Sequence, residues 1–186
     1  EVRGDIYLSG NGPEITNINI MRCKIFRIQD GFSPGIVLKN TIISECIIND
    51  IYVQIFGANN LVEKSIINSA GGISTVNLLF RNNIIFGLGN LFGYLQNCTF
   101  DNNILGYGEY IAGCILQNNL ILNGTLNPSQ LLSINNIYST YANTFINVPS
   151  SIYDITYNYH LKPTSNGKNA GTDGTDIGIY GTLRPC

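Results

Sequence analysis

Leu79-Phe-Arg-Asn-Asn-Ile84 is a six-residue unit that returns as Thr99-Phe-Asp-Asn-Asn-Ile104, Ile115-Leu-Gln-Asn-Asn-Leu120 and Leu132-Ser-Ile-Asn-Asn-Ile137. Three weaker copies precede it: Ile20-Met-Arg-Cys-Lys-Ile25, Ile42-Ile-Ser-Glu-Cys-Ile47 and Leu61-Val-Glu-Lys-Ser-Ile66. The last residues of successive units lie 16 to 22 positions apart. A repeat of this length indicates a solenoid, in which each unit forms one coil and packs only on its neighbours.

The composition favours short strands over helices. Of the 186 residues, 44% are hydrophobic and 12% are charged, and Asn and Ile each make up about one residue in seven. Ile, Val, Thr and Tyr favour strands, while Asn and the 20 Gly residues suit turns in which φ is positive. We therefore expect one domain with many strands, tight turns and no major helix.

These features predict an all-β fold, a right-handed parallel β-helix of about seven coils. Its strands would stack at about 4.8 Å, so that equivalent residues form columns. A side-chain amide in such a column can donate to one coil, accept from the next and tolerate the left-handed backbone of a sharp turn. The apolar residues on either side, such as Phe80 and Ile84, would stack in one continuous core. The predicted ladder residues are Asn82, Asn83, Asn102, Asn103, Asn118, Asn119, Asn135 and Asn136.

A leucine-rich repeat is the competing fold, because it also carries an asparagine ladder, at a period of about 20 to 29 residues. Its units return through a helical or 3₁₀ segment. The returns here, such as Phe86-Gly-Leu-Gly-Asn-Leu-Phe92, are rich in Gly and aromatic residues. We therefore favour the β-helix.

The repeat divides the chain into three parts. Residues 1–19 would be a partial first coil or the start of a fragment, 20–140 the β-helix coils, and 141–186 terminal coils with a C-terminal cap over the end of the core. The chain begins with Glu1 instead of Met, so we expect more chain before it. An open N-terminal end would be an unpaired edge, which further chain or other packed chains would cover.

The end of the chain resembles a known family. Tyr159-His-Leu-Lys-Pro-Thr-Ser165 and Asn169-Ala-Gly-Thr-Asp-Gly-Thr-Asp-Ile-Gly-Ile-Tyr-Gly181, together with the Asn-Asn-Ile coils, resemble the closing region of secreted right-handed β-helix repeat proteins. Such proteins are frequent in Bacteroidota and belong to the pectate-lyase-like superfamily. The resemblance covers about residues 15–182 and implies an extracellular or cell-surface location. The superfamily includes lyases, hydrolases, epimerases, adhesins and tailspikes, so it does not decide the activity.

Candidate catalytic residues are few. The hydrolases of this superfamily use adjacent Asp-Asp, Gly-His-Gly and Arg-x-Lys, and the first two patterns are absent from the sequence. A polysaccharide lyase needs a base, and a cation that neutralises the uronate carboxylate. Equivalent positions of successive units hold Glu63, Arg81 and Asp101, with Lys64 beside Glu63. The same column would also form a surface ion-pair ladder, which is the interpretation we favour.

Three residues near the C-terminus have metal-binding or catalytic side chains. Asp173 and Asp176 lie in a Gly-rich turn and could supply oxygen ligands to Ca²⁺, although two carboxylates are few for such a site. We favour Asx-turns for both. We expect the single histidine, His160, to be a cap residue with satisfied hydrogen bonds. The sequence implies no cofactor beyond the Ca²⁺ alternative.

Five cysteines make an odd set without the spacing of a zinc motif. Cys46 and Cys114 neighbour apolar strand residues, where a free cysteine packs as a small hydrophobe. At least one thiol of a secreted chain would stay free or pair with another chain, and the terminal Cys186 is the most available.

The sequence also limits the partners. Ten Lys and Arg against 12 Asp and Glu argue against nucleic-acid binding, and no stretch approaches the roughly 18 continuous apolar residues of a transmembrane helix. We expect a non-catalytic extracellular rod that displays a glycan- or protein-binding face within a larger protein or complex. The alternative is a polysaccharide-active enzyme, either a uronate lyase or a glycoside hydrolase. Several tyrosines could stack on sugar rings or pack over the loops in which they lie, and we favour packing. They are Tyr107, Tyr110, Tyr138, Tyr141, Tyr153 and Tyr157.

Overall fold

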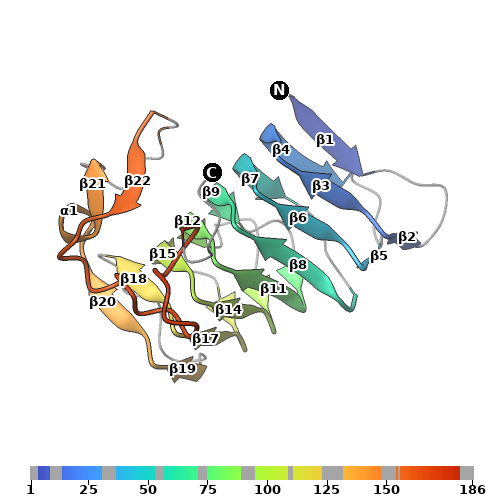
Figure 1. The fold of residues 1–186 in the computed structure, drawn as a ribbon. Helices are drawn as coiled ribbons and strands as arrows, with labels where there is room; N and C mark the ends of the chain where they lie inside the picture. The colour runs from blue at the N-terminus through green and yellow to red at the C-terminus, as the bar shows by residue number, and fades with distance from the viewer. Residues whose placement is uncertain are drawn as a thin grey trace.

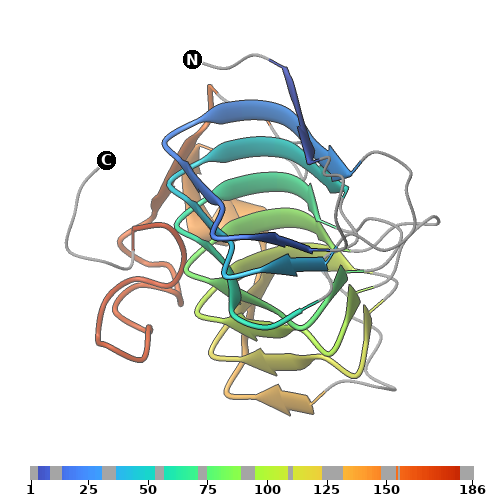
Figure 2. The same cartoon turned by 90° about the vertical axis from the view of Figure 1, so that its right-hand side faces the viewer.

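A computed structural model of the chain shows a parallel β-solenoid, in which short strands stack coil upon coil (Figure 1). Figure 2 shows the coils lying one above another in chain order. The predicted all-β solenoid is therefore confirmed. The structure describes residues 4–8, 14–30, 37–52, 57–70, 75–88, 95–108, 111–122, 132–147, 154 and 156–180.

The described strands form three sides. The long sheet contains β1 (Asp5–Leu8), β4 (Lys24–Asp30), β7 (Ile47–Tyr52), β9 (Ile66–Ala70), β12 (Ile84–Leu88), β15 (Ile104–Gly108), β18 (Leu120–Leu122) and β20 (Ile137–Ser139). The second sheet contains β3 (Asn19–Met21), β6 (Ile42–Ser44), β8 (Asn60–Glu63), β11 (Leu78–Arg81), β14 (Thr99–Asp101), β17 (Ile115–Gln117) and β19 (Leu132–Ile134). The third side contains β2 (Glu14–Thr16), β5 (Val37–Lys39), β10 (Thr75–Val76), β13 (Leu95–Gln96) and β16 (Ile111–Ala112).

The number of coils and the register of the first one differ from the prediction. We expected about seven coils, and the residues that the structure describes form about five turns. The described units that carry a strand on all three sides begin at β2, β5, β10, β13 and β16. In the first unit, Asn19 pairs with Ile42 and Lys24 pairs with Ile47. The unit therefore begins one residue earlier than the alignment of Ile20 with Ile42 predicts. The comparison matched isoleucines, whereas strand pairing aligns the turn residues.

The turn between the second and the long sheet uses one left-handed residue in every unit. These residues have φ between 50° and 56°. They are Arg22, Glu45, Lys64, Asn82, Asn102, Asn118 and Asn135. Asparagine tolerates this conformation better than most residues, which explains why the later units prefer it. The first of the two predicted asparagine columns therefore sets the backbone of the turn.

The second column forms the buried ladder. The Asn103 side-chain oxygen accepts the backbone N–H of Asn83 at 2.9 Å, and its side-chain nitrogen donates to the Phe80 carbonyl at 2.9 Å. Asn119 repeats both contacts one coil further on, toward the Asn103 N–H and the Phe100 carbonyl. The side chains of Asn83, Asn103 and Asn119 are fully buried. The predicted asparagine ladder is confirmed for this second column, whereas the described side chains of the first column make no hydrogen bond with one another.

The described cysteines occupy ladder positions. Ser65 precedes Asn83 in the column, and its hydroxyl oxygen accepts the backbone N–H of Cys46 at 3.1 Å. In the turn between the third side and the second sheet, the Cys98 N–H donates to the Cys114 sulfur at 3.3 Å. The hydrogen bond with Cys114, together with burial, raises the pKa of the Cys98 thiol. Cys186 lies outside the described residues.

The solenoid interior is lined from two sides. Phe80 and Phe100 stack with ring centroids 4.8 Å apart and planes within 1°. Opposite them, Ile85 and Leu105 belong to the same buried cluster. We predicted that Ile84 and Ile104 would share this core, and that prediction is wrong. The strand alternates after the turn, so the first residue of β12 and β15 points outward and the second points inward.

A second, outer core covers the long sheet from outside. The described part of the tail, residues 141–147, 154 and 156–180, contains α1 (Tyr141–Thr144), β21 (Phe145–Asn147) and β22 (Asn158–Leu161), and it lies along β12, β15 and β18 (Figure 1). The Phe86 ring lies 6.0 Å from that of Tyr141 and 5.6 Å from that of Tyr159. The tail, predicted as a cap on the end of the core, therefore packs along its side.

No helix that the structure describes is long enough to cross a membrane, and α1 is only one turn long.

Replacing Asn103 by Leu should destabilise the fold, because the Asn83 N–H and the Phe80 carbonyl would lose their partner. A buried polar group left unsatisfied costs about 1–3 kcal/mol. Urea denaturation should show at least this loss in the free energy of unfolding. The matched control is Asn135→Gly, because Asn135 is exposed and glycine adopts its positive φ freely. An unchanged stability of Asn103→Leu would contradict the ladder.

Alanine substitutions at two glycines of the tail distinguish the cost of overpacking from the cost of backbone strain. Gly178 and Gly174 have φ of 97° and 77°. A Cβ on Gly178 would lie 2.7 Å from the Ile104 side chain, whereas one on Gly174 would meet nothing within 4 Å. Alanine at either position should cost about 1–2 kcal/mol for the positive φ. Gly178→Ala should lose about 1–3 kcal/mol more by overpacking in thermal unfolding, and equal losses would argue against the docked tail.

Candidate functional site

The predicted charged column exists on the outer face of the second sheet. Glu63, Arg81 and Asp101 are register partners on β8, β11 and β14. The Arg81 guanidinium lies 2.8 Å from the Glu63 carboxylate, and the Arg81 side chain is 43% exposed. The Asp101 carboxylate accepts a hydrogen bond from the Asn118 side chain at 3.1 Å. The column is therefore a row of paired surface groups.

The neighbouring turn residues also have structural roles. Lys64 adopts the left-handed conformation that the turn requires, with φ of 50°. The Arg22-Cys-Lys24 segment fits the Arg-x-Lys pattern of the hydrolases. Arg22 lies in the same kind of turn, and its side chain pairs with Glu45 at 2.7 Å. The Arg22 pair therefore links the turns of two successive coils, while Lys64 occupies the left-handed position of its own turn.

The candidate Ca²⁺ ligands, Asp173 and Asp176, bond to other residues of the tail. Hydrogen bonds from the Thr175 side chain and backbone N–H hold the pKa of the Asp173 carboxyl below its ordinary value. The Asp176 carboxylate pairs with Lys168 at 2.6 Å. The described residues contain no group of three or more metal-ligating side chains. Asp173 thus makes the short-range contact of an Asx-turn, whereas Asp176 accepts the Asn169 backbone N–H at 3.1 Å and pairs with Lys168 across the loop.

His160 lies on the surface of the tail. Its ring stacks on that of Tyr180 with centroids 3.9 Å apart, and its Nδ1 lies 2.8 Å from the Asn158 side-chain oxygen. The tyrosines divide between the outer core and the surface. Tyr141 is buried, Tyr107 and Tyr138 are exposed, and Tyr110 and Tyr153 lie outside the described residues.

A groove of about 520 Å³ crosses three successive coils on the outer side of β8, β11 and β14. We call it the axial groove, because it runs from coil to coil. It is lined by Asn59, Asn60, Leu61, Asn77, Leu78, Leu79, Asn97 and Thr99.

The turn before the second sheet builds one edge of this groove. Asn59, Asn77 and Asn97 have φ of 63°, 59° and 52° and are exposed. They stand one coil apart, at the strand spacing of about 4.8 Å. The Asn59 side chain donates to that of Asn40 at 3.2 Å, whereas those of Asn77 and Asn97 make no hydrogen bond with any part of the chain that the structure describes. Their amides are free to bind a ligand.

Gly113 is the next residue in the column of Asn59, Asn77 and Asn97, and its missing side chain leaves room for the Asn97 amide. Gly113 has φ of 63°, and a Cβ there would lie 2.8 Å from the Asn97 side-chain oxygen. On the adjoining outward column, Leu61, Leu79 and Thr99 are half-buried. The groove thus combines a row of amides, which donate and accept hydrogen bonds, with an aliphatic floor.

The charged and aromatic residues of the sequence do not indicate the groove residues. A signal for them exists. Asn40, Asn59, Asn77 and Asn97 each stand two positions before the first residue of a repeat unit. A second column of left-handed asparagines could have been inferred from that spacing.

Comparison with protein-family models, with curated proteins and with solved structures found no match. The fold by itself defines the class: the chain is a parallel β-solenoid with an asparagine ladder. The axial groove is the feature of its described surface that points most directly to a ligand.

Replacing Arg81 by Met should separate the two interpretations of the charged column. If the column is an ion-pair ladder, the free energy of unfolding should change by less than about 1 kcal/mol, because the pair is partly exposed. Binding of neutral glycans should stay unchanged. Loss of a polysaccharide-cleaving activity in this variant, measured by the release of unsaturated ends, would instead support the enzyme alternative.

Proposed function

We propose that this chain is a non-catalytic extracellular β-solenoid module that binds polysaccharide along the axial groove. It would act as a rigid rod at the cell surface, within a larger protein or complex. The single observation that carries the proposal is the pair of amides, Asn77 and Asn97, that make no hydrogen bond with the described residues and stand beside Leu61 and Leu79 in the axial groove.

The chemistry of the groove matches that of a sugar polymer. A pyranose ring offers hydroxyl groups at its rim and C–H groups on its faces. The amides of Asn77 and Asn97 can bond to the hydroxyls, while Leu61 and Leu79 contact the C–H faces. Because strand pairing sets Asn77 and Asn97 one coil apart, an extended polymer along the groove would meet both amides.

The rigidity of the scaffold supports the same function. The amides project from turns that are held by strand pairing on both sides, as in the bond from the Asn77 N–H to the Gln96 carbonyl at 3.2 Å. Groups held in place before binding lose little conformational entropy when the ligand arrives. Weak contacts repeated along the groove can then add up to useful affinity.

The location and the lineage rest on resemblance. The tail sequence from Tyr159 to Gly181 resembles the closing region of secreted β-helix repeat proteins of the pectate-lyase-like superfamily, which are frequent in Bacteroidota. We therefore place the protein outside the cell, with a polysaccharide or a surface protein as its partner.

One observation favours a second function, a polysaccharide lyase or a glycoside hydrolase. Glu63, Arg81 and Asp101 stand two positions after Leu61, Leu79 and Thr99 on the same strands. Strand alternation puts both columns on the same face, so the charged groups border the axial groove. A uronate bound there would lie beside Arg81.

The double variant Asn77→Gly, Asn97→Gly tests the proposed function. Glycine keeps the positive φ of both turns and removes the two amides. Loss of two hydrogen bonds should weaken polysaccharide binding by about 5- to 150-fold in a panel of uronate-rich and neutral polymers, read for both bound and cleaved glycan.

The matched control is Asn17→Gly, which lies in the same turn column but outside the groove. It should bind like the unchanged protein. Equal affinities for the control and the double variant would refute the groove as the binding site, and cleavage of any polymer would favour the enzyme.

A further inference from the structure

A second hollow, which we call the tail pocket, lies where the last coil meets the tail. Its volume is about 290 Å³. It is lined by Tyr138, Ser139, Asn143, Lys162, Thr164 and Asn166. These residues come from β20, from α1 and from the segment that follows β22. None of them lines the axial groove, so the two hollows are separate.

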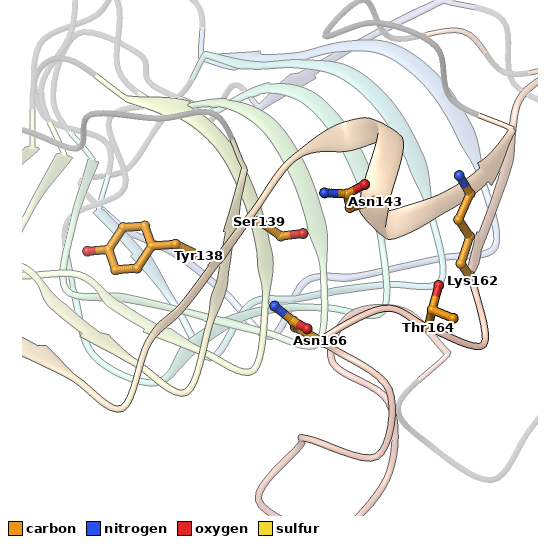
Figure 3. A pocket seen from close by; sticks show the side chains of 6 residues that line it. All are labelled: Tyr138, Ser139, Asn143, Lys162, Thr164 and Asn166. Carbon is orange, nitrogen blue, oxygen red and sulfur yellow. The ribbon is translucent and has the colours of Figure 1, made fainter.

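The lining side chains are arranged by chemistry. Figure 3 shows Ser139, Asn143 and Asn166 in the middle of the pocket, with Lys162 and Thr164 together on one side. Tyr138 stands at the opposite end, with its ring directed away from the amides. The ring is 63% exposed, so it forms an aromatic surface beside the opening.

Lys162 gives the pocket a positive charge. Its ammonium group donates to the backbone carbonyl of Ala142, a neutral acceptor, and makes no ion pair within the described residues. None of the described lining side chains carries a carboxylate. The charge is therefore not neutralised locally, and two of the three ammonium protons remain for a ligand.

The other polar groups are also available. The Ser139 hydroxyl oxygen accepts a hydrogen bond from the Thr144 hydroxyl at 3.0 Å, which leaves its own proton free to donate. The Asn143 and Asn166 side chains make no hydrogen bond with the described residues. The pocket thus offers one cation, two amides and two hydroxyls around a small space.

We propose that the tail pocket binds a small hydroxy-carboxylate, a molecule that carries one carboxylate and several hydroxyl groups. The carboxylate would bond to the Lys162 ammonium, and the hydroxyls to Asn143, Asn166 and Ser139. The volume of the tail pocket lies just below the range of about 300–1,000 Å³ for ligand pockets, and this size suits a molecule as small as one monosaccharide. This site is independent of the proposed function of the axial groove.

Isothermal titration with D-gluconate tests the proposal, using sorbitol and acetate as matched probes. Sorbitol keeps the carbon chain and hydroxyls without the charge, and acetate keeps the carboxylate without the hydroxyls. Gluconate should bind saturably at one site, and each of the other two more weakly by at least about tenfold. Equal binding of gluconate and sorbitol, or no saturable gluconate binding, would overturn the proposal.

Lys162→Gln should weaken gluconate binding by about 10- to 100-fold, because it removes a charge-assisted hydrogen bond. Its control is Lys168→Gln, which removes a lysine of the tail that pairs with Asp176 outside the pocket. If Lys162→Gln perturbs the fold, Asn166→Ala provides a second test of the same pocket, with an expected loss of about 2- to 10-fold. The Asn77→Gly, Asn97→Gly variant should bind gluconate normally, so failure of one site does not decide the other.

Discussion

Every coil of this protein depends on how the turn between the second and the long sheet satisfies its buried backbone groups. An unpaired backbone N–H or carbonyl in the interior costs about as much as a lost hydrogen bond. The asparagine ladder satisfies these groups with side chains from the adjacent coil: the Asn103 side chain accepts a hydrogen bond from the N–H of Asn83 and donates one to the carbonyl of Phe80. Because each amide serves the coil before it, the coils stack in one register.

That register produces the functional surfaces. Once the turns are aligned, every outward position becomes a continuous column, and columns bring together residues that are far apart in the chain. The amides of Asn77 and Asn97 face one groove for this reason, and Arg81 meets Glu63 for the same reason. A ligand that repeats along the solenoid axis is the natural partner of such a surface.

Strand alternation determines which residues share a core. After the turn, Ile84 points outward and Ile85 inward, so the long sheet has an apolar outer face as well as an inner one. The tail buries that outer face, and Gly178 brings its backbone against Ile104. The same docking places Lys162 beside the last coil and creates the tail pocket. The outer core therefore positions chemistry as well as stabilising the solenoid.

The sequence by itself determined the all-β solenoid, the asparagine ladder and the charged column of Glu63, Arg81 and Asp101, because each follows from the spacing of equivalent residues. Spacing also put Ile84 and Ile104 in the inner core, since it does not record on which side of a strand a residue lies. Only the tertiary structure decided that the tail runs along the solenoid and that the groove and the tail pocket open where they do. Those features depend on contacts between segments remote in sequence, such as Asn102 with Thr172 at 2.7 Å, which no local pattern encodes.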